Sequence, residues 1–175
     1  MSPVISVIII DFNSGDRIHK CLKHLRSQSY KGFEVIIINN GSADYSVQDF
    51  ESFDLNLNLI HADKNLGFAA GCNLAAKTAK GRWLAFLNPD AYADENWLKE
   101  FIDATDRYPD VQAFGSTQIN ADDRELIDGA GDVYHILGIG YRGYFGWDTR
   151  YLRLRAKSSP LAAQPLFTAP KHLTR

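Results

Sequence analysis

The residues with the clearest chemical potential surround a carboxylate that directly follows an apolar segment of strand length. Residues 82–87 are mostly apolar, and Asn88, Pro89 and Asp90 come immediately after them. Proline cannot donate a ladder hydrogen bond, so a buried strand should end here and leave Asp90 at the rim of a sheet. In open α/β sheets ligands bind outside the carboxyl ends of the strands, which makes Asp90 a candidate anchor for a metal or polar ligand. An ordinary turn aspartate is the alternative.

Further short polar side chains follow the preceding apolar segments in the same way. They are Asp11, Asn13, Asn39, Asn40 and Asn65. Each of them alone is more typical of a turn than of a binding contact. If the strands are parallel, however, their carboxyl ends share one edge of the sheet. Together these groups therefore predict a ligand cleft at that edge.

The elements that must position these residues alternate along the chain. The expected strands are residues 4–10, 34–38, 55–62, 82–87 and 111–115, and the expected helices are residues 15–27, 68–79 and 95–107. Repeated alternation of strand and helix predicts right-handed crossovers and a parallel sheet. The predicted fold class is therefore α/β, a Rossmann-like and mostly parallel sheet with helices on both faces.

The pattern weakens after residue 115. Glycine-rich segments at 128–132 and 138–146 predict loops and short strands, and the three prolines of residues 158–175 predict an irregular tail. Residues 138–143 match the spacing GxGxxG, but a dinucleotide fingerprint must follow the first strand and open a helix. We therefore exclude that interpretation. We expect three regions, with bounds 1–120, 121–157 and 158–175.

Composition limits the class of protein. The chain has 175 residues, of which 45% are hydrophobic and 23% charged, as in a globular protein with a sizeable core. Residues 4–10 are too short an apolar run to span a bilayer and lack a basic leader, so we expect a cytoplasmic protein. Cys21 and Cys72 form no CxxC pair, which predicts small buried side chains in place of a disulfide or zinc site.

Charge is unevenly distributed along the sequence. Residues 142–175 carry seven Lys or Arg and one acidic residue, whereas the other 141 residues carry twelve basic and twenty acidic groups. A basic tail has the charge to contact an anionic membrane surface, which would place the protein at the inner face of the membrane. A solvated terminal segment is the alternative. We expect no nucleic-acid partner.

The predicted rim could bind a nucleoside diphosphate. A pyrimidine ring presents an N3–H donor beside carbonyl acceptors, and Asp11 and Asn39 stand where they could pair with it. A diphosphate would be repelled by Asp90 unless a divalent cation lay between them. Mg²⁺ or Mn²⁺ needs few protein carboxylates when substrate phosphates complete its shell.

Four segments carry a resemblance to a known family, namely residues 6–13, 34–44, 65–73 and 87–91. In order and spacing they resemble the nucleotide-binding half of family 2 glycosyltransferases with the GT-A fold, most closely the bacterial rhamnosyltransferase-like members. The resemblance implies inverting transfer of a sugar from a UDP- or dTDP-sugar to a hydroxyl of a saccharide or lipid-linked acceptor, in polysaccharide biosynthesis. It also implies assistance by Mg²⁺ or Mn²⁺.

The resemblance assigns roles to individual residues. Asp11 would lie at the base and ribose, Asn39 at the pyrimidine edge, and Asp90 at the metal. The nucleotide-binding set that it implies is Asp11, Asn13, Asn39, Asn65, Gly67 and Asn88. Asn39 and Asn88 stand where the family usually has aspartate, and the loss of a charge at position 88 weakens the hold on a metal.

The general base is unassigned. The family places this carboxylate in a late acidic segment, but no acidic residue follows Asp148, and Asp128 and Asp132 are earlier loop residues. We therefore expect a truncated enzyme, with residues 1–120 as the donor-binding half and residues 121–157 as part of the acceptor side. The aromatic residues of 141–147 could stack on sugars or simply pack.

Two other functions are compatible with the sequence. A non-catalytic module that binds a nucleotide-sugar or carbohydrate would explain the missing base. A nucleotidyltransferase should have a loop rich in glycine and basic residues after the first strand, and residues 11–16 lack one. The sequence leaves the sugar, the acceptor and the oligomeric state open.

Overall fold

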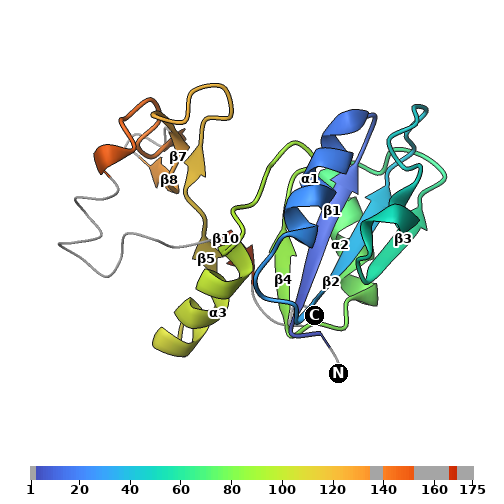
Figure 1. Ribbon diagram of the computed structural model, residues 1–175, viewed down its shortest axis with the longest axis horizontal. Helices are drawn as coiled ribbons and strands as arrows, with labels where there is room; N and C mark the ends of the chain where they lie inside the picture. The colour runs from blue at the N-terminus through green and yellow to red at the C-terminus, as the bar shows by residue number, and fades with distance from the viewer. Residues whose placement is uncertain (1–2, 135–139, 152–165, 169–175) are drawn as a thin grey trace. The chain divides into compact units, whose positions relative to one another are not determined.

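The computed structural model of the protein describes residues 3–134, 140–151 and 166–168 (Figure 1). The chain divides into two compact units. The first comprises Met1–Gln112 and Phe167–Arg175, and the second comprises Ala113–Leu166. All the polar residues predicted to form the rim belong to the first unit.

Four parallel strands form the centre of the first unit. They are β1 (Ile5–Asp11), β2 (Phe33–Asn39), β3 (Leu57–His61) and β4 (Trp83–Phe86), in the spatial order β3-β2-β1-β4. Every residue of β1 and β2 is buried, which explains their nearly continuous apolar sequence. The predicted mostly parallel sheet is confirmed, although β3 and β4 are shorter than expected.

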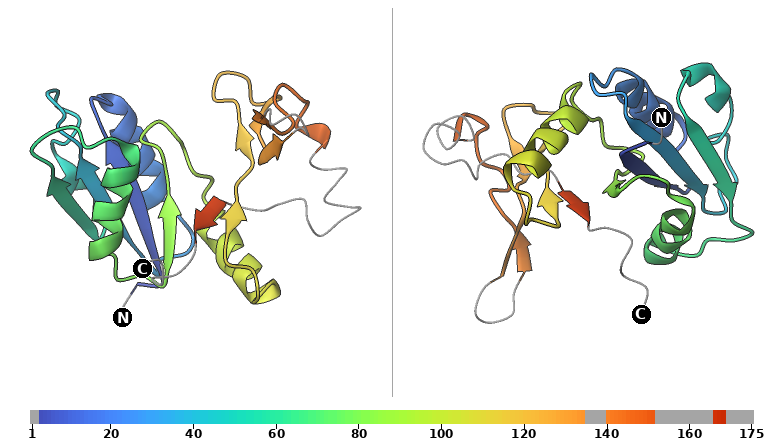
Figure 2. Two further views of the ribbon diagram at one scale, coloured as in Figure 1. Left: turned by 180° about the vertical axis from the view of Figure 1, so that it is seen from behind. Right: turned by 90° about the horizontal axis from the view of Figure 1, so that it is seen from below.

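Two helices cover opposite faces of this sheet (Figures 1 and 2). The helix α1 (Asp16–Arg26) buries Ile18, Cys21, Leu22 and Leu25. The helix α2 (Phe68–Thr78) approaches the other face closely, since a Cβ added to Gly71 would lie 3.1 Å from Cγ2 of Ile10. The core beneath α2 consists of Ile8, Ile10, Ile36, Ile38, Ala75, Ala79 and Leu84.

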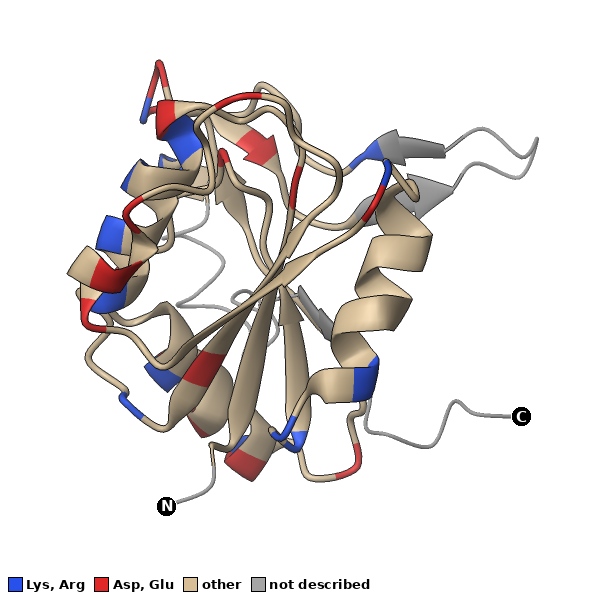
Figure 3. Ribbon diagram, turned by 90° about the vertical axis from the view of Figure 1, so that its right-hand side faces the viewer, with Lys and Arg blue, Asp and Glu red and all other residues tan. Residues whose placement is uncertain are grey.

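A third helix and a short 3-10 helix complete the first unit. The helix α3 (Trp97–Arg107) buries Leu98, Phe101 and Ala104, and the Phe101 ring meets the Trp83 ring edge-on at 5.3 Å between centroids. The 3-10 helix η1 (Phe50–Phe53) lies between β2 and β3 in sequence. Most of the charged residues lie on helices and loops, while the strands are mostly uncharged (Figure 3).

The second unit consists of short strands and loops in its described part. Its strands are β5 (Phe114–Gly115), β6 (Gln118–Ile119), β7 (Ile127–Gly129), β8 (Asp132–Tyr134) and β9 (Gly140–Arg142), with β6 antiparallel to β7 and β8 antiparallel to β9. This agrees with the predicted loops and short strands. Because residues 140–142 form a strand, the GxGxxG-like segment does not open a helix there.

Two predictions about regular structure were wrong. The strand expected at 111–115 is reduced to Phe114 and Gly115, because the Val111 amide instead donates to the Tyr108 carbonyl in a turn after α3. The tail expected to be irregular contains a strand, β10 (Leu166–Thr168), which pairs antiparallel with β4. Without β10, β4 would be an edge strand with unpaired backbone groups, which can pair with any extended segment. The three residues of β10 are too few to show an alternating hydrophobic pattern in the sequence. Residues 152–165 and 169–175 of the basic tail lie outside the described residues.

Candidate functional site

The register of the sheet brings the predicted rim residues side by side. Asp11 pairs with Asn39 across β1 and β2, and Asn39 pairs with His61 across β2 and β3. The loops that follow these strands lie at the top of the sheet in Figure 1. The Asn39 amide nitrogen lies 3.1 Å from Nδ1 of His61, which is exposed. The polar residues that end β1, β2 and β3 therefore form one continuous edge.

Asp11 is fully buried at this edge. Its carboxylate accepts hydrogen bonds from the hydroxyl groups of Ser14 and, at 2.8 Å, Ser42. The Ser46 hydroxyl, whose single proton is shared between Asp11 and Asp44, lies 2.7 Å from it. Its backbone carbonyl accepts a further bond from the Asn40 amide at 2.8 Å. Asp11 therefore holds the loop after β1 to the loop after β2, and its carboxylate does not face solvent.

Asn13 reinforces the same junction from an exposed position. Its backbone is left-handed, with φ of 51°, a conformation that asparagine tolerates better than most residues. Its side-chain oxygen accepts from the Ala43 amide at 2.8 Å, and its own amide donates to Oγ of Ser42 at 3.0 Å. The two loops are thus joined by backbone as well as side-chain groups.

Asp44 ties the same two loops together from the β2 side. Its carboxylate accepts from the Ser46 hydroxyl at 2.5 Å, and from the Ser46 and Gly15 amides at 3.1 and 2.9 Å. These hydrogen bonds, led by that of the Ser46 hydroxyl, lower the pKa of Asp44. The ionised form of Asp44 is therefore the one that fits the folded loops.

Asparagines also connect the loops after β2 and β3. Asn40 is buried; its amide nitrogen donates to Oδ1 of Asn65 at 3.1 Å, and its oxygen accepts from the Leu66 amide at 2.8 Å. Asn65 in turn accepts from the amide of Gly67, whose φ of 80° suits glycine. Asn65 and Gly67 are exposed, and they lead directly into α2.

Asn88 and Asp90 stand exposed just after β4. The Leu87 amide donates to the Ile8 carbonyl at 3.0 Å, which continues the β1–β4 pairing one step, and the Ala91 amide then closes a turn onto the Asn88 carbonyl. Among the residues that the structure describes, no three His, Cys, Asp or Glu side chains come together as a metal site. The protein therefore offers Asp90 as a single exposed carboxylate at this strand end.

Exposed apolar side chains on the same loops were missed by the sequence reasoning. Phe12 is 48% exposed between Asp11 and Asn13, and Tyr45 and Phe68 are 53% and 58% exposed. The sequence signal that could have indicated them is an aromatic residue flanked by polar residues in a turn, as at Phe12, because a ring there cannot pack into the core. Exposed aromatic groups at a cleft are typical of ligand contacts.

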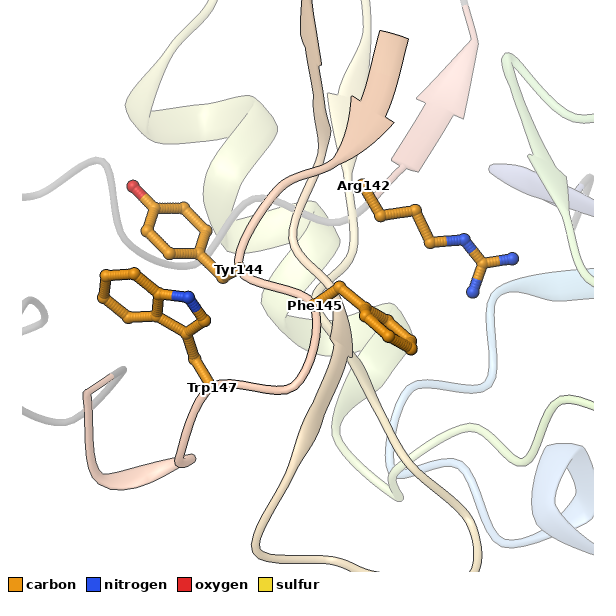
Figure 4. Close-up of a pocket in the computed structure, with 4 residues that line it drawn as sticks. All are labelled: Arg142, Tyr144, Phe145 and Trp147. Atoms are coloured by element: carbon orange, nitrogen blue, oxygen red, sulfur yellow. The ribbon is translucent and has the colours of Figure 1, made fainter.

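A hollow in the second unit is also lined by aromatic rings. Arg142, Tyr144, Phe145 and Trp147 surround about 660 Å³ of open space (Figure 4). Tyr144 and Trp147 meet edge-on with centroids 5.4 Å apart, and Arg142 donates to Asp128 at 2.8 Å. The aromatic rings of this segment thus pack on one another, while Phe145 and Trp147 stay more than half exposed.

Comparison with known proteins identifies the family. A sequence profile described as glycosyl transferase family 2 matches residues 6–164. The chain belongs to this glycosyltransferase family. The match includes all four segments on which the resemblance rested, and that prediction is confirmed.

Curated glycosyltransferases align with more than half of the chain. Glycosyltransferase AglE of Haloferax volcanii is 33% identical over 105 residues, which are 57% of this chain and 34% of that protein. Glycosyltransferase GlyG of Streptococcus pneumoniae is 28% identical over 102 residues, 57% of this chain and 34% of its own length. The chain thus spans about a third of the length of these glycosyltransferase relatives.

Solved glycosyltransferase structures share the fold. TarS of S. aureus in complex with UDP-GlcNAc superposes with a TM-score of 0.61 at 26% identity, over 75% of this chain and 36% of that one. Mannosyltransferase PcManGT of Pyrobaculum calidifontis, in complex with GDP-Man and Mn²⁺, has a TM-score of 0.63 at 19% identity over 98% of this chain and 56% of that one. At such low identity the second likeness supports the fold alone. The predicted GT-A fold is confirmed.

No helix in the described ranges of this glycosyltransferase chain is long and apolar enough to span a membrane.

Proposed function

We propose that this chain is the donor-binding part of an inverting glycosyltransferase that uses a UDP- or dTDP-sugar. One observation carries the proposal. The strand order β3-β2-β1-β4 changes direction between β1 and β4, and the carboxyl ends of those two strands bear Asp11 and residues 88–90. In open α/β sheets, nucleotides bind in the crevice at such a point.

The nucleotide base is proposed to lie over the ends of β1 and β2. Asn39 uses one oxygen lone pair for the Ser42 amide and one donor toward His61, so its amide still has one acceptor and one donor for a pyrimidine edge. Phe12, which directly follows Asp11 in the sequence, offers an exposed ring. We assign Asp11 the role of holding the serine-rich junction, and Asn13, Asn65 and Gly67 the role of shaping the loops around the ribose and diphosphate.

A divalent cation fits the residues after β4. Mg²⁺ or Mn²⁺ bound to a nucleotide takes one or two carboxylates from the protein and completes its shell with phosphate oxygens and water. Asp90 is an exposed carboxylate, and Asn88 adds an uncharged amide two residues earlier. When bound, the cation would neutralise charge on the leaving diphosphate.

The proposed reaction is a direct displacement at the anomeric carbon. An acceptor hydroxyl oxygen forms a bond to that carbon as the bond to the diphosphate oxygen breaks, and the configuration inverts. The hydroxyl proton passes to a general base, and the nucleoside diphosphate leaves with the bonding electron pair. The rim residues would orient the donor for this attack. The base is unassigned, because Asp128 is paired with Arg142 and the side chain of Asp132 lies outside the described residues.

The kind of enzyme, its acceptor and its location are proposed from the resemblance to the family. We propose a rhamnosyltransferase-like enzyme of polysaccharide biosynthesis, with a saccharide or lipid-linked acceptor on the side of the second unit. We place it in the cytoplasm, with contact of the basic tail at the inner membrane surface.

A non-catalytic nucleotide-sugar-binding module is the second candidate. It is favoured by the ion pair between Arg142 and Asp128, which occupies one of the two carboxylates considered as a base. Release of free sugar from UDP- or dTDP-sugars above the rate in buffer would contradict this candidate. Binding without hydrolysis or transfer would support it.

Calorimetric titration of UDP, dTDP and GDP, each with and without Mn²⁺, tests the donor site. We expect a pyrimidine nucleotide to bind more tightly with Mn²⁺, and we expect Asp90→Asn to remove most of that gain, about tenfold in affinity, which is about 1.4 kcal/mol. Affinity without the metal should not fall and should rise slightly, because the substitution removes the carboxylate that repels the diphosphate when no cation lies between them.

Asp106→Asn is the matched control, since it removes an exposed carboxylate from α3. It should bind like the wild type. The proposal fails if no nucleotide binds, or if Asp90→Asn and Asp106→Asn are indistinguishable.

A further inference from the structure

The loop that carries Asp90 is attached at three points to α1 and to the residue two positions beyond its end. The thiol of Cys21 lies 3.8 Å from the Asn88 carbonyl, Nδ1 of His24 lies 3.1 Å from the Ala93 carbonyl, and the side-chain amide of Gln28 donates to the Asp94 carbonyl at 2.6 Å. Positions 21, 24 and 28 fall on one face at helical spacing. Three successive polar groups of this face therefore hold carbonyls of residues 88–94.

Cys21 lies directly beneath the turn of residues 88–90. It is fully buried, and burial together with the nearby Asp90 carboxylate raises the pKa of its thiol to about 12. The thiol thus stays neutral and can donate to the Asn88 carbonyl.

Gln28 makes the strongest of these attachments. Its side chain is fully buried two residues beyond the end of α1. Its amide nitrogen also lies 3.3 Å from the His24 carbonyl, and its oxygen accepts from the Leu98 amide at 3.0 Å. Both ends of the side-chain amide are therefore used, and a buried group of this kind is expensive to remove.

The bond from Gln28 to Leu98 replaces a missing helix cap. The Asn96 side chain, at the position that normally caps α3, makes no capping hydrogen bond, although the first amides of a helix need partners. The side-chain oxygen of Gln28 accepts the hydrogen bond from the Leu98 amide in place of a cap. The Ser29 amide adds a bond to the Glu95 carbonyl at 2.8 Å, so the end of the loop is fixed to the segment after α1.

These contacts fix both ends of the segment that presents Asp90. Its start continues β4 through the bond between Leu87 and Ile8, and its end is held at Asp94 and Leu98 by Gln28. We propose that Gln28 is a positioning residue for Asp90, and that it holds the loop after β4 in the conformation that presents this carboxylate to the metal–diphosphate of the donor. This inference rests on the proposed function.

A positioning role differs from a purely structural one in what it affects. Loss of Gln28 should weaken the coupling between metal and nucleotide, because Asp90 becomes mobile. Binding of the base should be spared, because it involves β1 and β2. A purely structural role would lower stability and leave the coupling unchanged.

The test compares Gln28→Met, Gln28→Glu and Ser6→Ala in the full chain. Methionine keeps the length of the side chain and loses both polar ends, whereas glutamate keeps only the acceptor for the Leu98 amide. Ser6→Ala is the control. It removes two buried hydrogen bonds, one that Ser6 donates to Glu34 and one that it accepts from the Gly81 amide, and neither involves the loop. The probes are UDP, dTDP and GDP, titrated with and without saturating Mn²⁺, and amide hydrogen exchange of residues 88–98.

We expect Gln28→Met to reduce the Mn²⁺-dependent gain in nucleotide affinity about fivefold or more, the lower end of typical site-to-site coupling, with unchanged affinity in the absence of metal. Amide hydrogen exchange of residues 88–98 should accelerate in the same variant. In both the metal-dependent gain and the exchange rate, Gln28→Glu should be intermediate and Ser6→Ala should match the wild type.

Two kinds of failure are distinguishable. If the wild-type chain binds no nucleotide, the proposed donor site is wrong and the role of Gln28 falls with it. If the wild type shows the metal-dependent gain and Gln28→Met retains it, or Ser6→Ala loses as much, only the positioning role is overturned.

Discussion

Asp11 and Asp90 both end apolar strands, but their environments differ at the residue scale. Asp11 is fully buried with three serine hydroxyls within hydrogen-bond distance, whereas Asp90 is exposed at the rim. The donors to Asp11 come from loops 3 to 35 residues away in sequence. Two carboxylates that look equivalent in the sequence therefore have different tasks, one holding loops together and the other available to a ligand.

Phe12 gives a prediction at the same scale. If its exposed ring stacks on the nucleotide base, Phe12→Ala should weaken nucleotide binding about fivefold or more, because a stacked base contributes roughly 1–3 kcal/mol. The loss should be the same with and without Mn²⁺, since stacking does not involve the diphosphate. Calorimetry measures both values. Phe12→Tyr should bind like the wild type, as should Phe145→Ala, which removes an exposed ring from the second unit. Equal affinities for Phe12→Ala and the wild type would rule out stacking.

At the element scale, a buried polar cluster joins strands at the end of the sheet opposite the rim. The Glu34 carboxylate of β2 accepts from the Ser6 hydroxyl of β1 at 2.6 Å and from the Lys80 amide at 2.7 Å. Ser6 in turn accepts from the Gly81 amide, and a Cβ on Gly81 would lie 2.5 Å from the Ser6 nitrogen. This cluster fixes how the connection from α2 enters β4.

We expect Glu34→Ala to destabilise the fold by about 2–4 kcal/mol, because it leaves the Ser6 hydroxyl and the Lys80 amide without their acceptor. Glu34→Gln keeps an acceptor oxygen and should cost less, about 1 kcal/mol. Denaturant unfolding followed by circular dichroism measures both. Glu95→Ala, at an exposed glutamate ahead of α3, is the control and should stay within about 0.5 kcal/mol of the wild type. A Glu34→Ala variant as stable as this control would show that the cluster contributes little.

At the scale of the whole molecule, the stability of the fold depends on the ionised carboxylate of Asp44. The pKa of Asp44 is lowered by the Ser46 hydroxyl and by backbone amides, and it therefore lies below the value of about 3.9 expected in the unfolded chain. Ionised Asp44 consequently stabilises the fold above that unfolded value. The contribution is lost as the pH falls through the lower, folded pKa.

Asp44→Asn should therefore be less stable than the wild type at pH 7, and the difference should shrink toward zero on acidification below about pH 4. Thermal unfolding at a series of pH values measures this. Asp106→Asn, at an exposed carboxylate on α3, should follow the wild-type curve. A gap between Asp44→Asn and the wild type that stays constant down to the lowest pH would contradict the assigned role.

The elements of the first unit could be predicted because their signals are local. The unbroken apolar sequences of β1 and β2 and the helical spacing of Ile18, Cys21, Leu22 and Leu25 specify strand and helix within a few residues. The strand β10 and the limits of β5 could not be predicted in this way, because pairing with β4 and the turn at Val111 depend on residues far away or on backbone bonds. Side-chain pattern carries no information about either.

The sequence by itself determined the α/β class, the family and the residues gathered at the strand ends, because parallel strands all place their carboxyl ends at one edge. Only the tertiary structure decided how those residues divide their roles. It buries Asp11 among serines, uses Asn40 and Asn65 to join loops, and leaves Asp90 exposed on a loop that Gln28 holds. The physical reason is that hydrogen-bond partners are fixed by strand order and register, which bring together residues that lie far apart along the chain.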